Sequence, residues 1–302
     1  MCLNDQFFHA VSASCGDIRI LRAEPMSRHT SFRTGGPAQI ACPRTEESLR
    51  ALLELCSRSG VRVRILGAGT NVLAPDAGME ELVICLKDGL TGLRALSGSR
   101  IEAYAGESLA RTAIFAREQG LTGLEFAHGI PGSVGGGVFM NAGAYGSELS
   151  GVLESVTYLD LDGARHTVLG EQAQLSYRDS IFQHMPCVVV KAVFALQAGD
   201  KEQIDQTMRV LMARRKASQP LELPSAGSTF KRPTGHYAGA LIEQAGLKGT
   251  AVGGAQVSEK HAGFLVNAGG ASTADVLALI RLVQQKVFEQ SGVRLEPEVR
   301  IW

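Results

Sequence analysis

Hydrophobic side chains recur every three or four positions in several stretches, which is the pattern of a helix with one buried face. One such stripe runs over 49–56, between Thr45, a favourable helix N-cap, and Gly60, a common helix terminator. Another covers 276–287 and is followed by Gly292. The predicted helices cover 45–60, 106–119, 201–216, 237–245 and 273–290, with a short helix before Pro25 and another after the central glycine run.

Short apolar or alternating runs predict strands between these helices. Asp162-Gly163 stands between two of the runs and is a strong signal for a β-hairpin. The predicted strands cover 39–42, 61–66, 82–86, 92–96, 100–104, 153–160, 165–168, 187–196, 251–257, 263–267 and 293–301. A strand-rich region therefore precedes a smaller α+β unit, and we place the boundary between them near Gly199.

Composition narrows the class of protein. The 302 residues suffice for two domains, and 45% apolar with 20% charged residues fits a globular protein with a full core. Lys plus Arg and Asp plus Glu both total 30, so the chain has no net positive charge that would attract nucleic acid or an anionic membrane. No apolar run reaches membrane-spanning length, and we expect no membrane insertion.

The six cysteines, Cys2, Cys15, Cys42, Cys56, Cys85 and Cys187, are widely spaced and form no C-x-x-C pair. This spacing is not typical of a metal site or a disulfide framework, so we expect neither. The N-terminus also lacks the pattern of a secretory signal, and a cytoplasmic location is the expectation.

Two glycine-rich loops are the strongest candidates for ligand binding. Residues 128–146 contain seven glycines in nineteen positions, and Gly67-Ala68-Gly69-Thr70-Asn71 follows a predicted strand. Bare backbone N–H groups suit a phosphate or diphosphate, although tight structural turns are the alternative explanation. The second loop lacks the Lys of a P-loop and the third glycine of a Rossmann fingerprint. The loops and the separate α+β unit predict a nucleotide-type cofactor facing a substrate.

Seven motifs in order give the chain a family resemblance. Together they resemble the UDP-N-acetylenolpyruvoylglucosamine reductases, flavoenzymes of bacterial peptidoglycan precursor synthesis. Gly137 and Thr70 are small departures, because alanine and serine are commoner at those positions. The motifs are Arg33-Thr34-Gly35-Gly36-Pro37-Ala38, Gly67-Ala68-Gly69-Thr70-Asn71, 129–136, 140–146, Tyr177-Arg178-Asp179-Ser180-Ile181-Phe182, Ala226-Gly227-Ser228-Thr229-Phe230-Lys231 and Leu295-Glu296-Pro297-Glu298-Val299.

The resemblance implies an α+β fold with an FAD-binding domain of the vanillyl-alcohol-oxidase type and a C-terminal substrate-binding domain. The first would cover 1–199, as subdomains of about 1–86 and 87–199 with 293–302 returning to it, and the second 200–292. The chain looks like the second subtype, which lacks a tyrosine loop. Cofactors would be FAD and NADPH, the ligand a UDP-sugar, and the enzyme a monomer. Hydride would pass from NADPH to FAD N5 and on to C3 of the enolpyruvyl group, with protonation at C2.

The resemblance also implies three catalytic residues, each with a plainer alternative. Arg178 would clamp the substrate carboxylate, or else tie down its own loop through Asp179. Ser228 would donate the proton to C2, poised by a neighbour such as Lys231, or else cap a turn.

Glu298 would share a proton or a hydrogen bond with the developing enolate, which requires a raised pKa in a dry cleft; the plainer alternative is a solvated carboxylate, and Glu296 beside it is the decoy.

Binding residues follow from the same match. Substrate contacts would come from Lys231 and Arg232, with Arg214 and Lys260 as secondary candidates. An FAD oxidase and a non-catalytic flavin binder are the competing functions; the Lys231-Arg232 pair argues against the first, and retention of the catalytic three argues against the second. The FAD contacts would be Arg33, Gly67, Ala68, Gly69, Thr70, Asn71, Gly132, Ser133, Val134, Gly135, Gly136 and Asn141.

Overall fold

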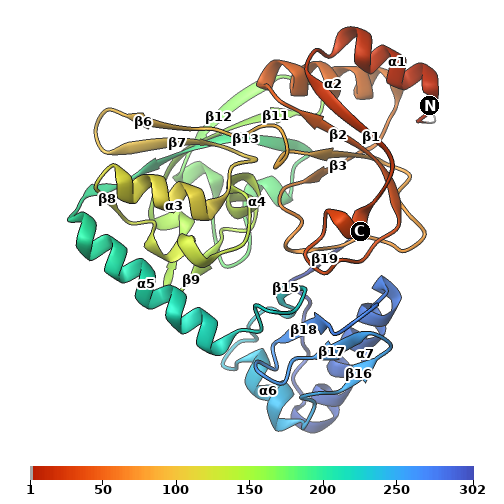
Figure 1. Cartoon of the computed structure of the whole chain (residues 1–302), viewed down its shortest axis with the longest axis vertical. Coiled ribbons are helices and arrows are strands. Elements are labelled where there is room, and N and C mark those ends of the chain that lie inside the picture. Colours follow the sequence, from red (N-terminus) through yellow and green to blue (C-terminus); the bar gives the residue numbers. More distant parts are fainter. Residues whose placement is uncertain (1–2) are drawn as a thin grey trace. The chain divides into compact units, whose positions relative to one another are not determined.

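The computed structural model describes residues 3–302, so Cys2 lies outside the described part. Contacts divide the chain into two compact units (Figure 1). Unit 1 contains the chain up to Arg22, Gln39–Ala68 and Glu80–Ala213. Unit 2 contains Ala23–Ala38, Gly69–Met79 and Arg214–Trp302. Among the described residues, no helix is both long enough and apolar enough to span a bilayer.

The first sheet has the strand order β1-β2-β5-β3. Strands β2, β5 and β3 are parallel, and every residue of β5 is buried, as expected for a strand covered on both faces. Helix α2 begins at the predicted N-cap Thr45 and ends at Gly60. The short helix expected before Pro25 ends much earlier, at Ser14, because the residues directly before Pro25 form a strand. The bounds are α1 Asp5–Ser14, β1 Ile18–Pro25, β2 Pro37–Pro43, α2 Glu46–Ser59, β3 Val63–Leu66 and β5 Leu82–Cys85.

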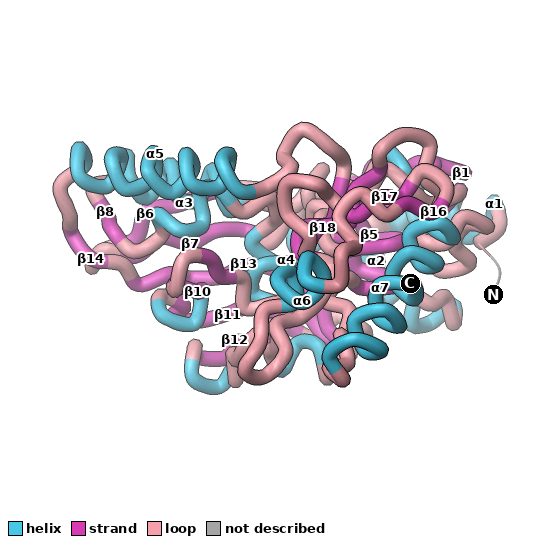
Figure 2. The backbone as a smooth tube through the Cα atoms, turned by 90° about the horizontal axis from the view of Figure 1, so that it is seen from below, coloured by secondary structure: helices cyan, strands magenta, loops and turns pink. Residues whose placement is uncertain are grey.

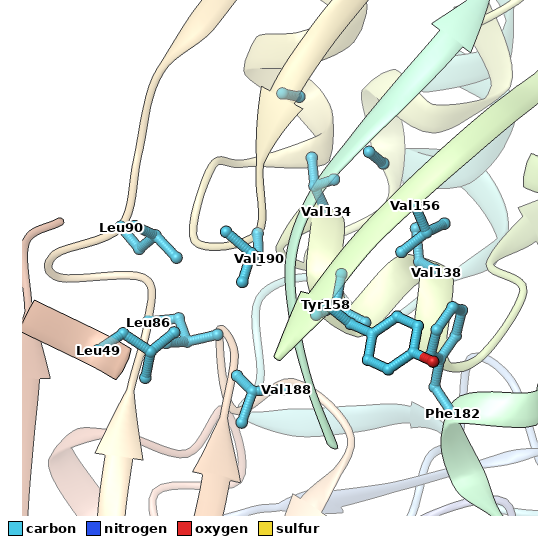
Figure 3. Close-up of a cluster of buried hydrophobic side chains, with 14 of the residues drawn as sticks. Leu49, Leu86, Leu90, Val134, Val138, Val156, Tyr158, Phe182, Val188 and Val190 are labelled. Atoms are coloured by element: carbon cyan, nitrogen blue, oxygen red, sulfur yellow. The ribbon is translucent and has the colours of Figure 1, made fainter. Parts of the chain in front are cut away.

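The second sheet is antiparallel throughout, with the order β12-β11-β13-β7-β6. The predicted hairpin at Asp162-Gly163 joins β11 to β12. Helix α4 packs on this sheet, mainly against β13, and its Val138 lies beside Val156 of β11 (Figure 3). The bounds are β6 Leu93–Leu96, β7 Arg100–Tyr104, α3 Leu109–Glu118, α4 Val134–Phe139, β11 Leu153–Asp160, β12 Arg165–Leu169 and β13 Cys187–Ala195.

Helix α5 (Lys201–Ser218) runs along α3 (Figure 2). An ion pair of 2.6 Å between Arg117 Nη1 and Asp205 Oδ1 joins the two helices. The remaining short elements of this part of the chain are η2 Glu125–Gly129, η3 Leu149–Gly151, η4 Glu171–Ala173, η5 Ile181–Gln183, β8 Leu121–Thr122, β9 Gly143–Ala144, β10 Ser147–Glu148 and β14 Gln197–Ala198.

Unit 2 is built on the antiparallel sheet β15-β18-β17-β16, with α6 and α7 packed beside it (Figure 1). The predicted apolar stripe of α7 is buried. The strand predicted over 293–301 is much shorter than expected: Arg300–Ile301 pairs in parallel with β4, and before it Pro297 forms only an isolated bridge with Phe230. The bounds are η1 Met26–Arg28, β4 Val72–Leu73, β15 Ser225–Ser228, α6 Ala238–Gln244, β16 Ala251–Val252, β17 Ala255–Val257, β18 Phe264–Asn267, α7 Thr273–Ser291 and β19 Arg300–Ile301.

Two early segments belong to unit 2 through specific hydrogen bonds. The carboxylate of Asp76 accepts the backbone N–H groups of Thr273 (2.8 Å) and Ala274 (2.9 Å), which are unpaired donors at the start of α7. The side-chain amide of Asn267 donates to the carbonyl of Phe32 at 3.0 Å. These compact units do not test the functional division at 199/200, which stays a prediction.

Candidate functional site

The first glycine loop and the start of the second, Gly67-Ala68, adjoin within unit 1. Gly67 directly follows β3, and Ser133 is the N-cap of α4. A Cβ atom on Gly67 would collide with the hydroxyl of Ser133, so the backbone at Gly67 approaches this side chain as closely as glycine allows. Ala68 follows Gly67 and Gly132 precedes Ser133 in the sequence, and both residues are half-buried.

Two of the predicted FAD-binding amides are engaged elsewhere, which corrects the sequence-based assignment. The N–H of Val134 donates to the carbonyl of Glu107, and that of Gly135 to the carbonyl of Ala105, both at 2.8 Å. A donor already bonded inside the protein is not available to a phosphate oxygen. The N–H of the exposed Gly136 meets the hydroxyl of Ser133 at 3.3 Å as part of the helix cap.

Asn141 is also corrected, because its side chain is fully buried and bonded at both ends. Its Nδ2 donates to the carbonyl of Ser176, and its Oδ1 accepts the N–H of Ser150, each at 3.0 Å. With no exposed surface it has no access to a cofactor. It instead supports the turn that carries Arg178.

Arg178 lies at the tip of a tight turn. Ser176 and Asp179 exchange two backbone hydrogen bonds of 3.1 Å across its base, and Arg178 has a left-handed φ of 56°. The alternative in which Arg178 is tied down by Asp179 is not supported. That carboxylate binds His184 Nε2 at 2.9 Å and the N–H of Ser180 at 2.9 Å.

A β-bulge determines where Ser228 points in unit 2. Ser225 pairs with Val266 and Ser228 with Phe264, so β15 holds one residue more than β18 over this interval. Regular alternation would place Ser228 on the buried face of Ala226. The bulge, at Gly227 with a φ of +74°, turns Ser228 to the exposed face instead.

Glu298 lies beside the residue that follows Ser228. The N–H of Glu298 donates to the carbonyl of Thr229 at 2.8 Å. From the other side, the side-chain amide of Asn71 donates to the carbonyl of Glu298 at 3.1 Å. Three motifs that are far apart in the sequence therefore meet at one residue, Glu298. The role of the Asn71 side chain was missed from the sequence, where only its loop was noted.

Glu296 and Glu298 have different surroundings. The ammonium group of Lys231 pairs with the carboxylate of Glu296 at 2.5 Å, and the N–H of Lys231 donates to the Glu296 carbonyl at 2.8 Å. No hydrogen bond joins Lys231 to Ser228 in the described chain, so the structure gives no support for Lys231 as the group that poises Ser228. Glu296 is the carboxylate that neutralises a cation.

The other predicted substrate cations are distributed over several elements. The guanidinium of Arg232 lies over the exposed ring of Tyr237, 4.0 Å from its centroid. Lys260 donates to the carbonyl of Lys216 at 2.7 Å. Arg214 is exposed on α5, and within the described residues no contact joins it to Lys231 or Arg232.

His261 packs beside the serine strand. Its Nδ1 accepts the N–H of Gly263 at 3.1 Å, and its ring meets Phe264 edge-on at 5.0 Å. Burial lowers the pKa of His261, because desolvation disfavours the imidazolium form. The neutral ring is therefore the form that holds the backbone N–H of Gly263.

The predicted FAD contact Arg33 is exposed and has a φ of 58°. Beside it, the hydroxyls of Ser31 and Thr34 are buried and have no hydrogen-bond partner in the described chain. The N–H of Ser31 donates to the carbonyl of Gly69 in the second glycine loop at 2.9 Å. Buried hydroxyls without partners are costly, so they fit polar atoms of a bound group such as FAD. The hydroxyl-rich composition of this turn was the only sequence signal for them.

Sequence models of known protein families match two parts of the chain. Residues 37–168 match the sequence model of an FAD-binding domain, and the chain is an FAD-dependent oxidoreductase. Residues 219–302 match the model described as the C-terminal domain of UDP-N-acetylenolpyruvoylglucosamine reductase. The reductase of Agathobacter rectalis is 45% identical over 99% of both chains, and that of Clostridium novyi is 49% identical over 91% of this chain and 90% of that one.

A solved structure agrees with the sequence relatives. The crystal structure of UDP-N-acetylenolpyruvylglucosamine reductase from Thermus caldophilus superposes with a TM-score of 0.79 and 36% identity. The superposition covers 95% of this chain and 100% of the Thermus caldophilus chain. The chain belongs to the UDP-N-acetylenolpyruvoylglucosamine reductase family. The predicted α+β fold with an FAD-binding domain, the use of FAD and the function in peptidoglycan precursor synthesis are confirmed.

Proposed function

We propose that the chain reduces UDP-N-acetylglucosamine enolpyruvate to UDP-N-acetylmuramate with NADPH, using Ser228, Glu298 and Arg178. The net change adds a hydride to C3 and a proton to C2 of the enolpyruvyl ether, while NADPH becomes NADP⁺. The observation that carries this proposal is the 2.8 Å hydrogen bond from Glu298 N–H to the residue after Ser228. It ties together the backbones of the two distant motifs that carry the Ser228 hydroxyl and the Glu298 carboxyl group.

FAD, when bound, supplies the two-electron chemistry that links NADPH to the substrate. The residues proposed to hold it come from the two glycine loops and from the Arg33 segment. Ser31 and Thr34 belong to this set because their buried hydroxyls have no partner among the described residues. Val134, Gly135 and Asn141 do not, because their amide groups are already hydrogen-bonded within the protein. The proposed set is Arg33, Ser31, Thr34, Gly67, Ala68, Gly69, Thr70, Asn71, Gly132, Ser133 and Gly136.

Each catalytic residue has a distinct role. Ser228, exposed at the bulge, gives its hydroxyl proton to C2. Glu298, in its protonated acid form, shares its proton with the enolate-like oxygen that develops as C3 is reduced. Arg178 holds the substrate carboxylate with its planar guanidinium, because that geometry matches two carboxylate oxygens at once.

The diphosphate of the substrate is proposed to bind at Arg232 and Lys231. Lys231 pairs with Glu296, which reduces the positive charge that Lys231 offers to a diphosphate. Lys260 is a secondary contact next to His261, and Arg214 is the weakest of the four because it stands apart on α5.

We also propose a cytoplasmic monomer. Every cysteine from Cys15 onward is free, which suits a reducing compartment. The exposed large apolar side chains come from separate elements, such as Leu169 of β12 and Val210 of α5, and suggest no obligate interface. A solution mass near 32.1 kDa by light scattering is the check on the monomer.

The test is an anaerobic two-step titration. NADPH should bleach the flavin absorbance, and UDP-N-acetylglucosamine enolpyruvate should restore it. Ser228→Ala and Glu298→Gln should leave bleaching within about twofold while slowing recovery by roughly 10²-fold or more, because general-acid groups contribute that much. Glu296→Gln is the matched control and should preserve the recovery rate at saturating substrate.

Two results would contradict the proposal. Equal losses in both steps for Ser228→Ala would remove its role as the proton donor to C2. Colour that returns only with oxygen, and not with the enolpyruvyl substrate, would indicate an oxidase instead.

A further inference from the structure

The peptide groups of Glu298 are held from two sides. Its N–H donates to Thr229 of the serine motif, and its carbonyl accepts the side-chain amide of Asn71. Asn71 makes a second bond to the same segment, because its own carbonyl accepts the N–H of Arg300 at 2.9 Å. The pairing of β4 with β19 begins directly after it.

This arrangement restricts the direction of the Glu298 carboxylate. With both neighbouring peptide planes bonded, the backbone from which the Glu298 side chain extends is held in place. Loss of the Asn71 donor would free the peptide between Glu298 and Val299 to rotate. A small misplacement of a reacting group is enough to slow catalysis strongly.

We propose that Asn71 is a positioning residue for Glu298: its side-chain amide fixes the Glu298 carbonyl instead of contacting FAD. This inference rests on the proposed function, which makes Glu298 a catalytic group. It assigns the Asn71 side chain to the substrate step and leaves only the backbone of that loop for the cofactor.

The test compares two variants of Asn71. Asn71→Ala removes the amide, and Asn71→Asp keeps the size of the side chain but replaces the donor with an acceptor. Both should slow substrate-dependent recovery of flavin absorbance about tenfold, a factor within the range that misplacement of a reacting group produces. Bleaching by NADPH should stay within about twofold, because only the second step uses Glu298. FAD affinity, measured by fluorescence titration of the apoprotein, should change less than about threefold.

Gln284→Ala is the matched control. Gln284 Nε2 donates to the carbonyl of Leu295 at 2.9 Å, so it is a side-chain amide that tethers the same C-terminal segment three residues before Glu298. Its loss should lower Tm about as much as that of Asn71, with the recovery rate unchanged. If Gln284→Ala and Asn71→Ala slow recovery equally, Asn71 is a general tether and the proposal is wrong.

A double-mutant cycle gives the sharpest readout. Once Glu298→Gln has removed the catalytic group, Asn71→Ala should slow recovery no further, because its effect acts through Glu298. Fully multiplicative losses would overturn the positioning role. A fall in FAD affinity that matches the loss of rate would assign the amide to the cofactor instead. If Glu298→Gln leaves recovery intact, the proposed function of Glu298 fails together with this inference, whereas normal recovery in both Asn71 variants alone overturns only the inference.

Discussion

Replacing Gly227 by alanine tests whether the β-bulge serves Ser228. Gly227 has a φ of +74°, and a Cβ atom there would meet nothing within 4 Å. The substitution therefore adds no collision, and its whole cost comes from the left-handed backbone. If the chain escapes that cost by adopting a negative φ, the bulge is lost and Ser228 turns toward the buried face of Ala226.

The size of the effect follows from the backbone. A residue other than glycine in the left-handed region costs about 1–2 kcal/mol. For a unit of this size that corresponds to a fall in Tm of about 2–8 °C, so the variant should still fold. The rate at which the enolpyruvyl substrate restores flavin absorbance should fall more than the stability, since misplacing a reacting group can slow a step by roughly 10–100-fold.

Gly292→Ala is the control for the backbone cost. Gly292 caps α7 with a φ of +69°, and it too has nothing within 4 Å of a Cβ position. Both variants should lose similar Tm in differential scanning calorimetry. Stopped-flow recovery of flavin absorbance with the enolpyruvyl substrate should slow for Gly227→Ala and stay within about twofold for Gly292→Ala. Equal recovery rates in the two variants would refute the reasoning about the bulge.

Two further predictions concern packing and pH. In Gly67→Ala the new methyl group meets the Ser133 hydroxyl, and such overpacking costs about 1–3 kcal/mol. FAD affinity in a fluorescence titration should therefore fall about tenfold, and adding Ser133→Ala should restore part of it. Unchanged FAD affinity in Gly67→Ala would contradict this prediction. Burial lowers the pKa of His261, so below about pH 6.5 the unfolded chain binds more protons than the folded one and stability falls as the pH falls. His261→Gln should flatten the profile of Tm against pH between about 5 and 6.5, and an unchanged slope would count against the neutral ring as the folded form.

The candidate site was predictable where its signal is a motif and not where it depends on side-chain partners. The sequence placed Ser228 and Glu298 in separate motifs, and the structure joins the two segments by a backbone hydrogen bond. It could not show that the Asn141 amide is used up by Ser176 and Ser150, because partners 35 and 9 residues away leave no periodic trace. The competing carboxylate Glu296 was likewise separated from Glu298 only by its pairing with Lys231.

The sequence by itself determined the local elements. Thr45 and Gly60 bound α2, the apolar stripe defined the buried face of α7, and Asp162-Gly163 formed the predicted hairpin, because caps, helical spacing and turn residues act over a few positions. Only the tertiary structure decided the long-range partners. The reach of Asn71 to Glu298 spans 227 residues, and such a contact forms when packed elements bring two segments together, a condition that neither segment encodes alone.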